Sequence, residues 1–241
     1  MFDKWMQYSY KAQKHQRHRL LKLLFVFLIL YVLYNCLTAF FFSIWALDND
    51  TMQPGLGPGD RLIFASTALP ARFTIIKPKD PLPFKRGSIV LVDMGLKRNR
   101  NLPLRILDGA VRFFTVQRVS IFSKDEQFYI KRVIGLPGDE ISMTNFVFRV
   151  KPQDSSYSLT EFELADKPYY PVIPQVPALW DETLPFSGNM DRIILGPDEC
   201  FTASDDRGNT NDSRTWGPVS SGLITARAVF RFWPLTKIGR P

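Results

Sequence analysis

The residue with the clearest chemical potential is a lysine inside an apolar, strand-like segment. Lys131 lies within Tyr129-Ile130-Lys131-Arg132-Val133-Ile134, and Tyr129 shares its face because strand side chains alternate. A lysine among apolar groups loses hydration in its charged form, so its pKa falls and its neutral amine can act as a general base. For any single lysine the commoner role is to reach solvent at a strand end. Catalysis by Lys131 therefore requires a partner group.

Two polar segments offer candidate partners. The first, Asn49–Gly55, contains the hydroxyl of Thr51. A hydroxyl becomes a competent nucleophile when a base takes its proton, and hydroxyl plus lysine is an established alternative to Ser-His-Asp in peptide cleavage. The second is the Gly/Asn/Asp-rich loop Ser204–Gly217, where Asp212 and Arg214 share a face of an extended segment. An exposed pair of this kind contributes only about 0–1 kcal/mol, so we expect it to hold the loop.

These segments must be positioned by a domain that follows an apolar run. Residues 23–47 carry no charge. A helix of this length can cross a hydrocarbon core of about 30 Å. The positive-inside rule places the N-terminus in the cytoplasm, because Asp48 and Asp50 follow the run and these basic residues precede it: Lys4, Lys11, Lys14, Arg17, Arg19 and Lys22. The sequence predicts a basic cytoplasmic tail (1–22), an uncleaved transmembrane anchor (23–47) and an external domain (48–241).

The external part has a mostly β pattern. Segments rich in Val, Ile and Phe alternate with Gly, Pro and Asp; they are Arg61–Phe64, Ser88–Val92, Arg112–Val119, Phe128–Ile134, Phe146–Val150, Arg192–Leu195 and Leu223–Trp233. Prolines concentrate in 68–84 and 151–186, which predicts long loops, or a small cap in the second case. The basic run 97–100 suits a solvated hairpin tip, with a lipid-headgroup contact as the alternative.

Composition argues against other classes of function. The formal net charge is +8, but most of the excess lies in the N-terminal tail, which disfavours a nucleic-acid partner. The two cysteines, Cys36 in the apolar run and Cys200 far along the chain, are not expected to form a disulfide. Both histidines, His15 and His18, lie in the tail, so we expect no zinc site, and no motif implies another cofactor.

Three separated blocks, in this order, resemble type I signal peptidases. They are Asn49–Asp60 with Thr51-Met52-Gln53-Pro54, then Tyr129–Asp139 around Lys131, and the loop Ser204–Gly217 ending in Ser213-Arg214-Thr215-Trp216-Gly217. The segment 85–90 is similar to the family's intervening strand. The resemblance implies a signal peptidase-like β domain with a loop-rich cap insertion at 151–186, preceded by one N-terminal transmembrane helix.

The resemblance also implies roles for individual residues. Thr51 stands where the family has a serine nucleophile, and Lys131 is the base. The Thr51 backbone N–H and the Asn49 side chain would stabilise the oxyanion. Thr210 replaces a serine that orients the lysine, while Asp212 and Arg214 would hold the loop. Ser204 and Asp206 stand where the family has Gly and Asn.

We therefore expect a membrane-anchored endopeptidase that removes signal peptides from exported preproteins on the external side of the membrane. The substrate would bind extended beside a sheet edge. Two alternatives stay open: a paralogue that binds signal peptides without cleaving them, and a specialised peptidase with one dedicated substrate.

Overall fold

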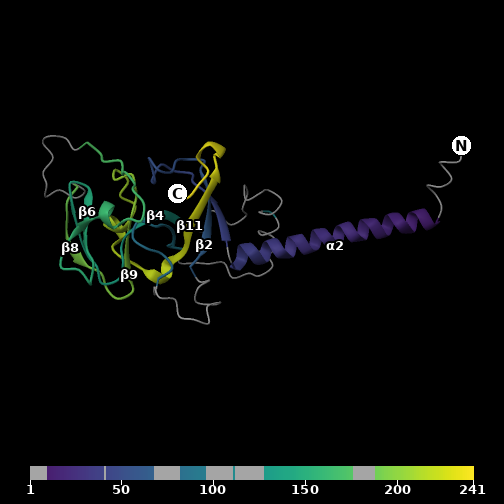
Figure 1. The fold of residues 1–241 in the computed structure, drawn as a ribbon, viewed down its shortest axis with the longest axis horizontal. Coiled ribbons are helices and arrows are strands. Elements are labelled where there is room, and N and C mark those ends of the chain that lie inside the picture. Colours follow the sequence, from purple (N-terminus) through teal and green to yellow (C-terminus); the bar gives the residue numbers. More distant parts are fainter. Residues whose placement is uncertain (1–9, 41, 68–81, 96–110, 112–127, 176–187) are drawn as a thin grey trace.

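Two antiparallel sheets form the β domain, and a long helix leads into it from the N-terminal side (Figure 1). The computed structural model describes residues 10–40, 42–67, 82–95, 111, 128–175 and 188–241. The mostly β prediction for the part of the chain after the apolar run is confirmed.

The larger sheet carries the segments of chemical interest. Its strand order is β1-β2-β11-β3-β4-β9-β10. Their bounds are β1 Phe42–Ala46, β2 Arg61–Ser66, β3 Ile89–Asp93, β4 Phe128–Gly135, β9 Glu199–Ala203, β10 Val219–Ser220 and β11 Ile224–Trp233. Lys131 lies in β4, which pairs with β3 on one side and β9 on the other.

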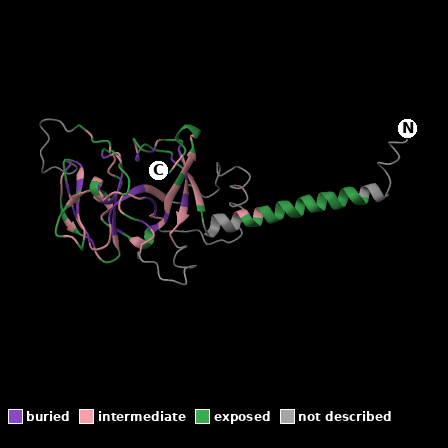
Figure 2. Cartoon of the chain, viewed as in Figure 1, coloured by how far each residue is buried: buried purple, intermediate pink, exposed green. Residues whose placement is uncertain are grey.

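The smaller sheet has the order β7-β6-β5-β8. Its strands are β5 Glu140–Thr144, β6 Val147–Lys151, β7 Leu159–Thr160 and β8 Met190–Ile194. Short helices lie between strands at α5 Glu161–Leu164, α6 Ser213–Trp216 and η1 Ser221–Leu223, and η2 Leu235–Lys237 follows β11. The buried residues gather in the two sheets, whereas the described side chains of the N-terminal helix are mostly exposed (Figure 2).

Most of the predicted strands are confirmed with small shifts at their ends: β2, β3, β4, β6, β8 and β11. The predicted strand 112–119 and the basic run 97–100 lie outside the described residues, as does most of the segment 68–84. Sequence patterning missed β1, β5 and β9, and also the two-residue strands β7 and β10.

The uncharged run 23–47 was predicted to form one continuous helix, and the structure differs from that prediction. Helix α2 spans Tyr10–Phe40, and Phe42–Ala46 instead form β1, which pairs antiparallel with β2. The strand's backbone groups find partners in β2, which hydropathy alone does not reveal. Within the part of the chain that the structure describes, no helix combines the length and mean hydropathy of a membrane span.

The described part of the insertion 151–186 contacts the larger sheet's loops. It contains β7 and α5, and residues 176–187 lie outside the described part. Its Val172 backbone N–H donates to the Asp205 carbonyl, while the Arg207 N–H donates to the Val172 carbonyl, both at 2.9 Å. The insertion therefore packs on the loop that follows β9.

Candidate active site

Lys131 is enclosed by aromatic rings and one hydroxyl. Its side chain is 1% exposed, and Nζ lies 5.9 Å from the centre of the Tyr129 ring and 5.8 Å from that of Trp216. The two rings pack on each other with centroids 4.9 Å apart. Nζ donates a hydrogen bond of 2.8 Å to Ser204 Oγ. The predicted shared face of Tyr129 and Lys131 is consistent with these contacts.

This enclosure lowers the pKa of Lys131 from its ordinary 10.5 to about 8. Burial is the largest cause, since it penalises the charged amine. The carboxylates of Asp212 and Asp205 act in the opposite direction, and the guanidinium of Arg214 reinforces the lowering. A lysine with this pKa has a substantial neutral fraction near pH 8 and can accept a proton there.

Ser204 reaches Lys131 through the register of two strands. The antiparallel pairing of β4 with β9 matches Arg132 to Ala203, which brings the next residue of the second chain segment, Ser204, opposite Lys131. Sequence reasoning noted Ser204 only as a replacement for glycine. The only sequence feature that pointed to Ser204 as a partner of Lys131 is its small hydroxyl side chain directly after a strand. Recognising the contact also required the pairing of β4 with β9.

Asp212 and Arg214 form the predicted pair, but the pair is buried rather than exposed, and Arg214 lies in helix α6 with Asp212 as its N-cap rather than in an extended segment. Arg214 Nε and Nη2 donate to the two oxygens of Asp212 at 3.0 and 2.8 Å. Asp212 also accepts the Ser204 backbone N–H at 2.8 Å. Burial opposes ionisation of Asp212, but the hydrogen bond and charge of Arg214 hold its pKa below the usual range. The pair thereby fixes the residue that contacts Lys131.

Thr210 is placed differently from the role expected of it. Its carbonyl accepts the Asp212 backbone N–H at 2.8 Å and the hydroxyl of Thr215. Among the contacts of the described residues, the hydroxyl bonded to Lys131 is that of Ser204 and not that of Thr210.

Thr51 lies in a turn between β1 and β2. The residue that follows it, Met52, is fully buried with Leu56 in the apolar cluster of that end of the sheet. Thr51 is itself 8% exposed, and its Oγ1 donates to Asn49 Oδ1 at 2.8 Å. The Thr51 backbone N–H points at the same oxygen at 3.4 Å. Asn49 therefore contacts both groups of Thr51 that were predicted to act in catalysis, here as an acceptor.

One short segment connects Thr51 with Lys131. The Asp206 N–H donates to the Thr51 carbonyl at 3.0 Å, and Ser204, two residues earlier, accepts from Lys131. Between them, Asp205 is held by Arg132, whose Nε donates to it at 2.7 Å. Two residues of extended chain cover about 7 Å, so the segment keeps the two predicted catalytic residues in one neighbourhood.

Sequence reasoning also missed a buried charged cluster behind this segment. Arg207, fully buried, pairs with Glu161 of the insertion, and Tyr169 Oη donates to the same carboxylate. The Arg132 guanidinium stacks on Tyr169, 3.9 Å from its ring centre. A fully buried arginine is unexpected from sequence alone. Its partner, Glu161, is distant in sequence, so no local sequence pattern predicts the ion pair.

These features define a class of site: a buried lysine of lowered pKa and a turn hydroxyl, which lie on separate elements of a β fold and both contact the segment that follows β9. A sequence model of the family described as signal peptidase, peptidase S26, matches residues 18–233. The chain therefore belongs to this family, as its three sequence blocks indicated.

Individual relatives match a shorter stretch. The chain is 32% identical over 113 residues to a probable signal peptidase I-2 of Synechocystis sp., covering 46% of this chain and 41% of the relative. It is 33% identical over 112 residues to signal peptidase I of Leptolyngbya laminosa (46% and 44%). For signal peptidase I of Bacillus caldolyticus the identity is 31% over 130 residues (52% and 64%). The matches span less than two thirds of these relatives.

Proposed function

We propose that this chain is an endopeptidase that removes signal peptides from exported preproteins, with Thr51 as nucleophile and Lys131 as general base. The observation that carries the proposal is the buried amine of Lys131, with its pKa lowered to about 8 and tied through Ser204 to the segment that binds Thr51. Family membership supplies the reaction class, and the relatives' names supply the substrate class.

In the proposed reaction, Thr51 Oγ1 attacks the scissile carbonyl carbon and its proton passes to Lys131 Nζ. The carbon–nitrogen bond then breaks, and Nζ returns the proton to the leaving amine. Water, deprotonated by the same amine, hydrolyses the Thr51 ester and regenerates the hydroxyl. Ser204 accepts a hydrogen bond from Nζ, so we assign the lysine-orienting role to Ser204 in place of Thr210.

Asn49 links activation of the nucleophile to stabilisation of the oxyanion. Its Oδ1 holds the Thr51 hydroxyl and faces the Thr51 N–H, so neither group is free for substrate. Turning the Asn49 amide about its last bond replaces Oδ1 by the Nδ2 donor. That one rotation releases the hydroxyl toward Lys131 and directs Nδ2 and the Thr51 N–H at the developing oxyanion.

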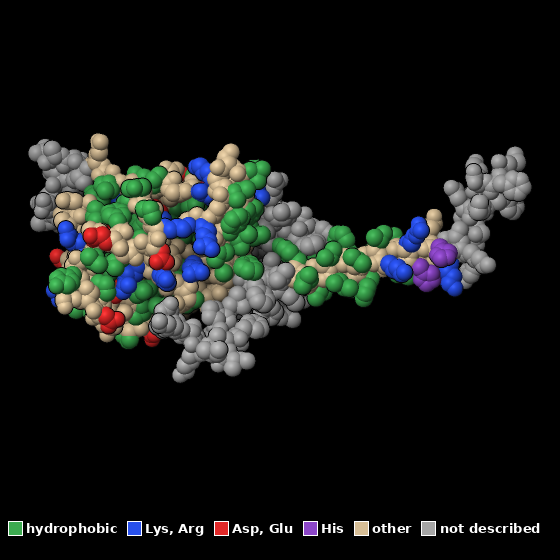
Figure 3. Space-filling model, viewed as in Figure 1, with side chains coloured by type: hydrophobic (Ala, Val, Ile, Leu, Met, Phe, Trp, Pro, Cys, Tyr) green, Lys and Arg blue, Asp and Glu red, His purple; other side chains and the backbone are tan. Residues whose placement is uncertain are grey.

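We further propose that the enzyme is anchored in a membrane by α2, with its N-terminus in the cytoplasm. Apolar side chains from Leu20 to Leu33 are exposed along the helix, and basic side chains precede them (Figure 3). Protease added outside sealed cells should digest residues 48–241 and spare the tail. Protection of the β domain would contradict this topology.

A cleavage assay on a generic preprotein tests the chemistry. Wild-type activity should rise with pH through about 8, because the neutral form of Lys131 predominates above its pKa. Lys131→Arg should be inactive, since a guanidinium does not give up its proton, and Thr51→Val should be inactive for lack of a hydroxyl. Thr51→Ser, which retains the oxygen, is the matched control and should cleave.

The outcomes separate the candidate functions. A wild-type chain that binds but never cleaves signal peptides would indicate a binding paralogue. Cleavage of one exported protein and of no generic preprotein would indicate a dedicated peptidase. Full activity of Thr51→Val would exclude Thr51 as the nucleophile.

A further inference from the structure

A second site lies on the other side of β4 from the Lys131 amine. A cavity of about 310 Å³ is bounded by β3, β4, β11 and the chain near Arg240. Arg132 lines it, and its neighbour Lys131 points to the opposite face because side chains alternate along a strand. The cavity is therefore separate from the proposed active site, although the two share strand β4.

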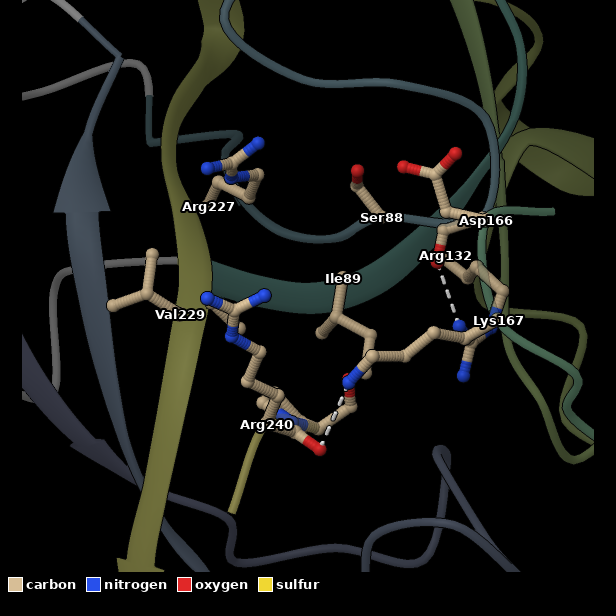
Figure 4. Close-up of a pocket in the computed structure, with 11 residues that line it drawn as sticks. Ser88, Ile89, Arg132, Asp166, Lys167, Arg227, Val229 and Arg240 are labelled. Atoms are coloured by element: carbon tan, nitrogen blue, oxygen red, sulfur yellow. Dashed lines mark hydrogen bonds between the residues drawn. The ribbon is translucent and has the colours of Figure 1, made fainter.

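Positive charge dominates the cavity. Arg227 and Arg240 lie on one side, beside β11, while Arg132, Asp166 and Lys167 lie across from them (Figure 4). Lys and Arg side chains also gather on the face of the β domain seen in Figure 3. Cavities lined by one sign of charge concentrate counter-ions of the opposite sign.

The ion pairs of the lining leave two cations unbalanced. Arg132 is paired with Asp205, and Lys167 Nζ donates to the backbone oxygens of Arg240 and Pro241. Asp166, the acidic side chain of the lining, has Lys85 as its own partner at 3.8 Å. Among the described residues, neither Arg227 nor Arg240 has an ion-pair partner. Both guanidiniums can therefore bind an anion inside the cavity.

The arrangement of donors favours a tetrahedral anion. Guanidinium groups approach from the β11 side, and the Ser88 hydroxyl and the Lys167 amine lie elsewhere around the cavity. A carboxylate presents two coplanar oxygens, whereas a phosphate can accept from several directions and also forms bidentate bonds with arginine. Ile89 adds an apolar side chain to the lining, which suits a carbon chain attached to the phosphate.

We propose that this cavity binds a phosphate ester, with Arg227 and Arg240 as its principal ligands. The same chemistry occurs in a soluble sugar or glycerol phosphate and in the headgroup of an anionic phospholipid. The cavity volume lies at the lower end of the range for small-molecule sites, about 300–1,000 Å³, so the bound group is of the size of glycerol phosphate.

The test uses the full chain in a maltoside detergent and a phosphate-free buffer. Isothermal titration with glycerol 3-phosphate should give saturable binding that weakens as salt is added. Glycerate, the matched carboxylate, should bind at least about tenfold more weakly. The double variant Arg227→Gln with Arg240→Gln should weaken glycerol phosphate binding at least about tenfold, since each lost charged hydrogen bond is worth roughly that factor.

A control pair matches the change in charge. Arg149→Gln with Arg192→Gln removes two arginines from the smaller sheet, outside the cavity, and should leave binding unchanged. To identify the source of the phosphate, phosphatidylglycerol in mixed micelles is compared with diacylglycerol, the same lipid without its phosphate. Tighter binding of the phospholipid than of glycerol phosphate, lost in the double variant, would identify a headgroup; the reverse order would identify a soluble ester.

Three results would overturn the proposal: no saturable binding of any phosphate ester, equal binding of glycerate, or equal weakening by the control pair. Melting temperatures of both double variants show whether each is folded. A folded Arg227→Gln, Arg240→Gln protein that binds like wild type rejects the site.

Discussion

Replacing the buried lysine should make the protein more stable while abolishing its activity. In Lys131→Met the charged amine is exchanged for an apolar side chain of similar length. Lowering the pKa from 10.5 to about 8 corresponds to a penalty of roughly 3 kcal/mol for holding the charged lysine in the folded state at pH 7. Losing the Ser204 hydrogen bond costs about 1 kcal/mol. The net expectation is a gain of roughly 2 kcal/mol at pH 7.

The gain should disappear as the pH rises. Between pH 8 and 10.5 the unfolded chain keeps the Lys131 proton that the folded chain has lost, so the stability of the wild type rises with pH in this window. Below pH 8 the amine is protonated in both states and the penalty is complete. Above 10.5 it is neutral in both, and Lys131→Met should be equal to the wild type or about 1 kcal/mol less stable.

Urea unfolding of the full chain in detergent, followed by tryptophan fluorescence at pH 7 and pH 10.5, measures the difference. A gain of roughly 2 kcal/mol moves the midpoint by about 1 M urea. Lys85→Met, at an exposed lysine, is the control and should change stability by less than about 0.5 kcal/mol. A Lys131→Met protein less stable than wild type at pH 7, or a difference independent of pH, would refute the assigned burial penalty.

Substitutions at four further positions test the assigned roles in the cleavage assay. Ser204→Ala should lower kcat about 2- to 10-fold and move the midpoint of the pH profile downward, because the charged amine loses an acceptor; Thr210→Ala should change neither quantity. Asn49→Asp should lower kcat about 10²- to 10³-fold, since a carboxylate has no donor for the oxyanion, and Asn49→Ser should recover part of that loss. Arg214→Gln should move the pH midpoint upward, and an unchanged or lower midpoint would contradict its influence on Lys131.

Local patterns predicted the parts of the site that depend on neighbouring residues. Tyr129 and Lys131 share a face because they are two apart in a strand, and Asp212 pairs with Arg214 across a similarly short interval. The Ser204 contact escaped prediction because it depends on the register of β4 against β9, which lie far apart in sequence. Register depends on how the patterns of both strands fit together in the assembled sheet, so neither strand alone fixes it.

The end of α2 could not be predicted for a different reason. The chain on both sides of Phe40 is uncharged and rich in apolar residues, so hydropathy does not mark the point where the helix ends and β1 begins. The strand forms because β2 offers backbone partners from Arg61 to Ala65. Arg207 was missed because its burial depends on Glu161 in the insertion, a pairing that only the folded chain creates.

The ion pairs around the site explain how a lysine with acidic neighbours keeps a low pKa. An unpaired Asp212 would attract the Lys131 ammonium and raise its pKa, which would remove the base at neutral pH. Instead, Arg214 binds Asp212 with two hydrogen bonds, and Arg132 binds Asp205 in the same manner. Each carboxylate is thus neutralised by its own arginine, and burial is left as the leading influence on Lys131. The arginines hold the carboxylates of the loop in place and also limit how far these carboxylates raise the pKa of Lys131.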